Sequence, residues 1–176
     1  MRTLVVIGLL VGSFVGVVAQ QPSQKAQAIA ATFNKHKNVV KEKRGVRMEK
    51  YKDVRAEPVV KQDAGDYLGI YEVGDLGFLI RIEVSNVDKI LARGYEQGGS
   101  RTFKLENATI EGGLLTGSKV YQDGTTESFE GVFLNRTERN SPTAMPVTTF
   151  GLGVWLNKPV EINGLTFQRM FYELKR

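Results

Sequence analysis

The chain has 176 residues, a formal net charge of +5, one histidine and no cysteine. A chain of this length suits one domain with an appendage and can bury a core that needs no disulfides. The single histidine and the lack of cysteine exclude zinc sites of the common ligand types and any chemistry based on thiols.

Residues 1–19 predict a secretory signal peptide. Arg2 gives a positive start, and the segment from Leu4 to Val18 is almost wholly apolar. This run is short for a membrane span, and Ala19 provides the small residue that precedes a cleavage site. We therefore expect a secreted or periplasmic mature chain that begins at Gln20 and has no transmembrane segment after cleavage. An uncleaved anchor is the alternative.

Residues 20–64 predict a basic helical arm and linker. Ser23 is a suitable helix cap, and four apolar residues follow at helical spacing: Ala26, Ile29, Ala30 and Phe33. Gly45 is the expected stop, although the periodicity weakens before it. The segment 46–60 fits either a helix or extended backbone.

The basic character of the chain is concentrated in this arm. The window 35–57 holds nine lysines and arginines and four acids, so it alone carries a charge of +5. It can be a solvated helix face, or it can bind an anionic surface such as phospholipid head groups or an envelope polymer. Nucleic acid is not expected as a partner, because no recognition motif accompanies the charge. The candidate residues for an anionic surface are Lys35, Lys37, Lys41, Lys43, Arg44 and Arg47.

From Gly65 onward the pattern predicts a mainly β domain over residues 65–176. Turn residues recur about every ten positions, and β-branched and aromatic residues fill the intervals. The expected strands cover 67–72, 78–84, 89–95, 102–105, two strands within 113–137, 148–155 and 165–174. About eight strands with short connections favour a single antiparallel up-and-down or meandering barrel, with the N-terminal helix packed across one end. A two-sheet sandwich is the second choice.

The clearest hairpin signal lies between Gly113 and Thr137. A two-residue turn at Asp123-Gly124 would place Val120 opposite Glu127. One face would then carry the bulky residues Leu114, Val120, Phe129 and Phe133 among Thr116, Ser118 and Gly131. The other face would carry Leu115, Tyr121, Val132 and Leu134 among Lys119, Thr126, Ser128 and Glu130.

At Gly65-Asp66-Tyr67 the layout resembles the calycin group, the lipocalin and avidin type of barrel, in which a Gly-x-aromatic element opens the first strand. The resemblance covers the order and spacing of strands from Gly65 to Leu174. Tyr67 replaces the usual tryptophan, and the single tryptophan of the chain is Trp155. The chain is also similar in style to uncharacterised exported bacterial proteins of this size, a likeness that assigns no activity.

Aromatic side chains in the β region could line a cavity or fill a core. For Phe129 and Phe133 the core is the favoured interpretation, whereas polar residues on the same face favour a cavity, because a filled core has little use for them. The candidate ligand-binding residues are Tyr67, Tyr71, Thr116, Ser118, Glu127, Phe129 and Trp155.

Paired carboxylates are the catalytic chemistry that the composition leaves open. Asp123, Glu127 and Glu130 cluster on the hairpin, but Glu127 and Glu130 point to opposite faces. A Ser-His-Asp arrangement would need His36, which lies in a charge run and is expected on the surface. The sequence predicts no catalytic residue, no metal site and no cofactor.

The sequence therefore favours an exported, non-enzymatic binding or interaction module of the cell envelope. Its expected partner is a small apolar ligand or an anionic envelope surface. The alternative is a small carboxylate-dependent, glycosidase-like hydrolase. An enzyme would need two acids that converge on one cleft, whereas a binding protein would need an apolar cavity.

Overall fold

The computed structural model describes residues 21–73, 79–84, 90–96, 100–162 and 164–175, and within them the chain is mainly β. The predicted signal peptide, residues 1–19, lies outside the described residues. Two short helices are α1 (Gln24–Ala31) and the 3-10 helix η1 (Ala64–Tyr67). The strands are β1 (Lys35–Lys43), β2 (Val46–Pro58), β3 (Gly69–Glu72), β4 (Leu79–Val84), β5 (Ile90–Glu96), β6 (Arg101–Glu111), β7 (Leu114–Tyr121), β8 (Thr126–Arg139), β9 (Val147–Ile162) and β10 (Leu165–Lys175).

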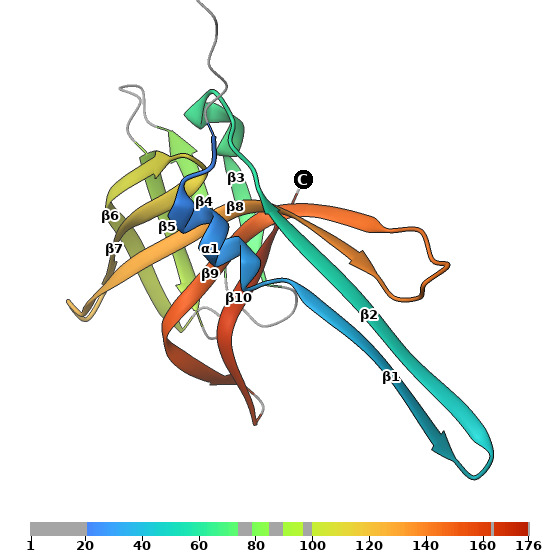
Figure 1. The fold of residues 1–176 in the computed structure, drawn as a ribbon. Coiled ribbons are helices and arrows are strands. Elements are labelled where there is room, and N and C mark those ends of the chain that lie inside the picture. Colours follow the sequence, from blue (N-terminus) through green and yellow to red (C-terminus); the bar gives the residue numbers. More distant parts are fainter. Residues whose placement is uncertain (1–20, 74–78, 85–89, 97–99, 163, 176) are drawn as a thin grey trace, which may run out of the picture.

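Strands β3 to β10 follow the predicted up-and-down barrel topology (Figure 1). Each strand pairs antiparallel with the next along the chain, and β10 pairs back with β3. The ten-stranded sheet as a whole is not closed, because β1 and β2 extend it from β8 as a long hairpin that projects from the barrel. The ten strands within the described residues belong to one sheet, which agrees with the barrel and not with the sandwich.

The helix α1 forms where its apolar spacing predicts. The Ser23 hydroxyl accepts a hydrogen bond from the backbone N–H of Ala26 at 3.1 Å and so caps the helix. The predicted stripe is buried, and it packs on Ala56 of β2 and on Val132 and Leu134 of β8. These residues lie on the outer wall of the barrel, so the expectation that the helix covers one end is wrong. Within the described residues, no helix has the length and apolar character that a membrane crossing requires.

The basic run is a β-hairpin, so the prediction of a helical arm fails beyond α1. Strands β1 and β2 pair along all nine residues of β1. The turn consists of Arg44 and Gly45, both with positive φ, as tight two-residue hairpin turns require. Eight of the nine β1 residues are exposed, so neither face of the strand shows the apolar alternation by which strands are recognised. The arm is joined to the barrel because Asp53–Pro58 pairs with Leu134–Arg139 of β8.

The turn between β7 and β8 is longer by one residue than predicted. Hydrogen bonds from Gly124 N–H to the Tyr121 carbonyl and from Tyr121 N–H to the Thr125 carbonyl close a three-residue loop. Gly124 has a φ of 81° and takes the left-handed position that such loops give to glycine. Val120 therefore lies opposite Thr126, not opposite Glu127.

This shift of one residue exchanges the two faces of β7. Leu115, Lys119 and Tyr121 join Phe129 and Phe133 inside the barrel. The predicted inward residues of β7 instead share the outer face with Val132, namely Leu114, Thr116, Ser118 and Val120.

The barrel is filled at the end that η1 covers. The ring centres of Tyr67 and Phe133 lie 4.3 Å apart, and the hydroxyl of Tyr71 donates a hydrogen bond of 2.7 Å to the Tyr67 carbonyl. Tyr71, Phe133 and Tyr172 are almost wholly inaccessible to solvent. Any cavity for a ligand must therefore lie toward the opposite end.

Candidate ligand-binding site at the barrel mouth

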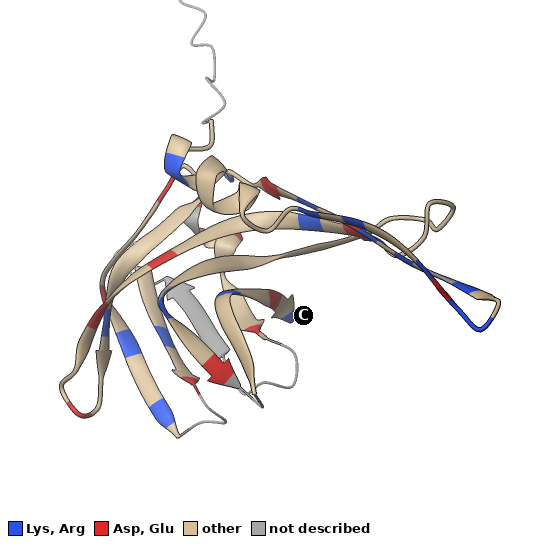
Figure 2. Ribbon diagram, turned by 60° about the horizontal axis from the view of Figure 1, so that its bottom comes forward, with Lys and Arg blue, Asp and Glu red and all other residues tan. Residues whose placement is uncertain are grey.

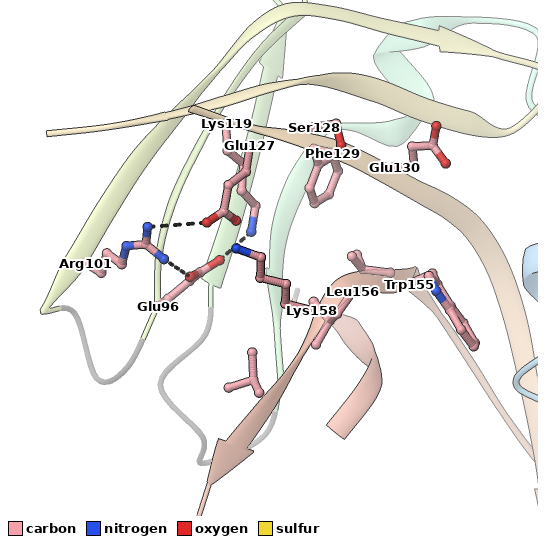
Figure 3. A pocket seen from close by; sticks show the side chains of 12 residues that line it. Glu96, Arg101, Lys119, Glu127, Ser128, Phe129, Glu130, Trp155, Leu156 and Lys158 are labelled. Atoms are coloured by element: carbon pink, nitrogen blue, oxygen red, sulfur yellow. Dashed lines mark hydrogen bonds and ion pairs between the residues drawn. The ribbon is translucent and has the colours of Figure 1, made fainter. Parts of the chain in front are cut away.

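A pocket of about 300 Å³ opens at the end of the barrel opposite η1 (Figure 3). Its apolar surface comes mainly from Phe129 of β8 and from Val154, Leu156 and Val160 of β9. Charged residues from β5 to β9 form the rest of the wall: Glu96, Arg101, Lys119, Glu127, Glu130 and Lys158. The pocket is thus an apolar floor within a charged rim.

An ion pair between Glu96 and Lys119 is the most buried polar feature of this pocket. The two residues are 8% and 5% exposed, and the Lys119 ammonium group contacts the Glu96 carboxylate directly. The ammonium also lies 4.5 Å from the ring centre of Phe103 and 5.3 Å from that of Phe129. Because an unpaired charge is costly to bury, this pair holds two side chains in one fixed arrangement.

Arg101 and Tyr121 extend this pair into a network toward the rim. The Arg101 guanidinium lies 3.8 Å from Glu96 and 3.4 Å from Glu127, and its central carbon is 3.6 Å from the ring centre of Tyr121. The Tyr121 hydroxyl is within 3.3 Å of both Glu96 oxygens and 3.2 Å from Glu127. Burial raises the pKa of Tyr121, and the charges of Glu96 and Glu127 raise it further, so the phenol remains a hydrogen-bond donor at neutral pH.

Strand register brings these groups together. Glu96 is the last residue of β5 and lies directly opposite Arg101, the first residue of β6. Lys119 of β7 lies directly opposite Glu127 of β8, on the same face of the sheet. Side chains alternate between the inside and the outside of the barrel along each strand. Strands β5 to β8 thus each direct one charged side chain into the mouth, two of them acidic and two basic.

Lys158 completes the rim and differs from the other cations. It projects from β9 toward the pocket, near Glu96 (Figure 3). Its side chain makes no ion pair with any described residue. The Glu130 carboxylate contacts Lys25 of α1 outside the barrel, so the charges that face the pocket are three cations and two acids. Nowhere in the described chain do three His, Asp or Glu side chains group as a metal site would need.

The structure brings together only part of the ligand-binding set that the sequence suggests. Glu127 and Phe129 line the pocket, and Trp155 lies at its edge with its ring directed away from it. Tyr67 and Tyr71 belong to the filled end of the barrel.

Thr116 and Ser118 are wrong as ligand contacts, because the shifted register turns both to the outer face. Sequence reasoning missed Glu96, Arg101, Lys119 and Lys158. A loop of three residues that ends at Gly124 predicts the observed register, in which Lys119 and Phe129 lie on the same face.

The surface candidates on the arm divide between its two faces and its tip. Lys35, Lys37, Lys41 and Lys43 share one face of the hairpin, Arg44 lies in the turn, and Arg47 lies on the opposite face. His36 lies at the exposed surface, as predicted, with its ring 3.4 Å from the Asp53 carboxylate.

Comparisons of the chain with protein-family models, curated proteins and solved structures found no match.

Proposed function

We propose that this chain is an exported, non-enzymatic binding module of the cell envelope, and that the barrel mouth binds a small amphipathic anion. The supporting observation is the pocket itself, which is concave and joins an apolar floor to a rim whose acids are already paired. An apolar group would contact Phe129, Val154 and Leu156, while the acidic group would face Lys158.

The charge balance of the rim supports an anionic group over a cationic one. Both acids already have cationic partners, because Glu96 contacts Lys119 and Arg101, and Glu127 contacts Arg101. A cationic ligand would have to compete with these partners. An anion meets Lys158, whose charge no described acid neutralises.

A carboxylate-dependent hydrolase is the second candidate, because Glu96 and Glu127 do converge on one pocket. Their oxygens lie within hydrogen-bond distance of the same Tyr121 hydroxyl, which is close enough for a pair of catalytic acids. However, each of the four carboxylate oxygens already contacts Lys119, Arg101 or Tyr121. A general acid needs an oxygen that faces the substrate, so this arrangement favours binding over hydrolysis.

Export and the calycin likeness are parts of the same proposal. The apolar run that begins at Leu4 and ends before Ala19 supports secretion or a periplasmic location. The up-and-down order of β3 to β10 supports the resemblance to lipocalin and avidin barrels.

The proposal is tested with 1-anilinonaphthalene-8-sulfonate, a fluorescent probe that combines apolar rings with one anionic group. Lys158→Gln should weaken probe binding about fivefold or more, as expected for the loss of one exposed charge contact. The matched control is Lys104→Gln, which removes a lysine from the outer face of β6 and should leave binding within twofold. Equal effects of the two substitutions, or none, would place the probe elsewhere and overturn the proposal.

The rival activity is tested with a panel of 4-methylumbelliferyl glycosides. Turnover that disappears in both Glu96→Gln and Glu127→Gln would replace the binding proposal with the hydrolase. No turnover, together with probe binding that depends on Lys158, is the expected result.

A further inference from the structure

The two faces of the hairpin arm differ in charge, because one carries lysines without described acids and the other mixes arginines with acids. Residues directly opposite each other in an antiparallel pair project to the same side, so the register assigns each side chain to a face. One face, here called the lysine face, carries Lys35, Lys37, Lys41, Lys43, Lys50 and Lys52. The described acids of the arm, Glu42, Asp53 and Glu57, all lie on the opposite face. Figure 2 shows lysine and arginine positions from the base of the arm to its tip.

This separation works against the stability of the hairpin. Lys37 lies directly opposite Lys52, and like charges in that position repel across the strands. Glu138 of β8 lies 3.2 Å from Lys52, but none of the described acids pairs with Lys37. Mixing acids into the lysine face would have removed the repulsion. Folding of the hairpin therefore gives no reason for the pattern, whereas an external anion does.

The lysine face continues into a groove on the outer wall of the barrel. The groove has a volume of about 740 Å³ and lies between the end of α1, the base of the arm and strand β10. Its cations are Lys35, Lys52, Arg136 and Arg169, and its exposed aromatic residue is Trp155. Arg136 lies 5.1 Å from the ring centre of Phe171, so the groove combines cations with aromatic surface.

We propose that the lysine face docks the protein onto an anionic phospholipid bilayer. Nine residues of strand span about 30 Å, which exceeds the screening length of about 8 Å in physiological salt, so the face suits an extended surface and not one small anion. Its cations are lysines, which act as mobile point charges, whereas paired recognition of individual phosphates favours arginine. Val46 on the lysine face is 60% exposed, and Trp155 at the groove is 41% exposed. Both can contact the boundary between head groups and acyl chains.

The proposal is tested by comparing two double variants of the full chain. Lys37→Gln with Lys50→Gln removes two charges from the lysine face. Arg47→Gln with Arg55→Gln removes two charges from the opposite face of the same hairpin. Binding is measured by co-sedimentation with vesicles of phosphatidylcholine mixed with phosphatidylglycerol, and with vesicles of phosphatidylcholine alone. Every variant keeps the same residues 1–20, so insertion of that apolar segment would contribute equally to all of them.

The lysine-face variant should bind the mixed vesicles about tenfold or more weakly, and the opposite-face variant should stay within about threefold of the unmodified chain. The difference between the two variants should also shrink steeply with salt and disappear on phosphatidylcholine alone. Equal losses in the two variants, or no preference for the mixed vesicles, would overturn the proposal. Preferential binding of duplex DNA, used as a soluble polyanion in competition with the vesicles, would also overturn it. Circular dichroism checks that both variants keep their strand content.

Discussion

Removing the ammonium group of Lys119 should destabilise the protein through the carboxylate that it leaves behind. Lys119→Met keeps a side chain of similar length but leaves Glu96 buried, with Arg101 at 3.8 Å and the Tyr121 hydroxyl at 3.3 Å. Breaking a buried pair typically costs about 3–5 kcal/mol. Because Glu96 keeps these two contacts, we expect the free energy of unfolding to fall by about 2–3 kcal/mol.

The reverse substitution and the double variant separate the pair from its surroundings. In Glu96→Met the Lys119 ammonium keeps only its contacts with the ring faces of Phe103 and Phe129, which offset part of its desolvation cost. We therefore expect the free energy of unfolding to fall by about 2–3 kcal/mol here as well. Replacing both residues with methionine removes both orphaned charges and should bring the protein within about 1 kcal/mol of the unmodified chain. The coupling free energy between the two sites should therefore be at least about 3 kcal/mol.

Urea unfolding followed by far-UV circular dichroism measures these differences. The matched control is Lys104→Met, which breaks the exposed Lys104–Glu106 pair of 2.7 Å on β6 and should change stability by less than about 1 kcal/mol. If the losses of the two single variants simply add in the double variant, the charges of Glu96 and Lys119 do not depend on each other and our description of the mouth is wrong. The same holds if Lys119→Met is no more harmful than the control.

The remaining predictions concern high pH and the start of the mature chain. Burial raises the pKa of Tyr71 and Tyr172 above the usual 10.0, so the folded state keeps phenol protons that the unfolded state has lost, and stability must fall as pH rises above 10.0. Each such tyrosine lowers the free energy of unfolding by about 1.4 kcal/mol per pH unit in this range. In urea unfolding from about pH 9 to about pH 11.5, the free energy of unfolding of Tyr172→Phe should therefore decline less steeply than that of the unmodified chain. Parallel curves would contradict this. Intact mass of protein recovered from the exterior or periplasm of a bacterial host should correspond to a chain that starts at Gln20, and a mass that includes residues 1–19 would reject the signal peptide.

Local patterns in the sequence were sufficient for the elements with one apolar face. Alternation on β8 correctly placed Phe129 and Phe133 on one side of a strand, and the spacing of Ala26, Ile29 and Phe33 correctly predicted a helix with one buried stripe. In both cases the side chains alone distinguish the inside from the outside.

The mouth could not be assembled from the sequence, because it depends on register between strands. The pair Asp123-Gly124 fits both a two-residue turn and a three-residue loop, and the choice decides whether Lys119 faces the interior or solvent. The arm was missed for a different reason. A strand with both faces in water, such as β1, carries no apolar period, so the charges of residues 35–43 resembled a solvated helix.

Strand β8 has a consequence for the order in which the chain can assemble. Its second half pairs with β9 on one edge and with β2 on the other, so that Ala56 meets Arg136 and Thr137 meets Thr148. During synthesis β2 is made long before the β8 edge with which it pairs. Likewise, α1 is made long before Val132 and Leu134, on which it packs. The hairpin of β1 and β2 and the helix α1 can contact one another early, but their attachment to the barrel wall must wait until most of the chain has been made. Such late, long-range closure slows folding, because contacts between distant parts of the chain can form only after most of it is available.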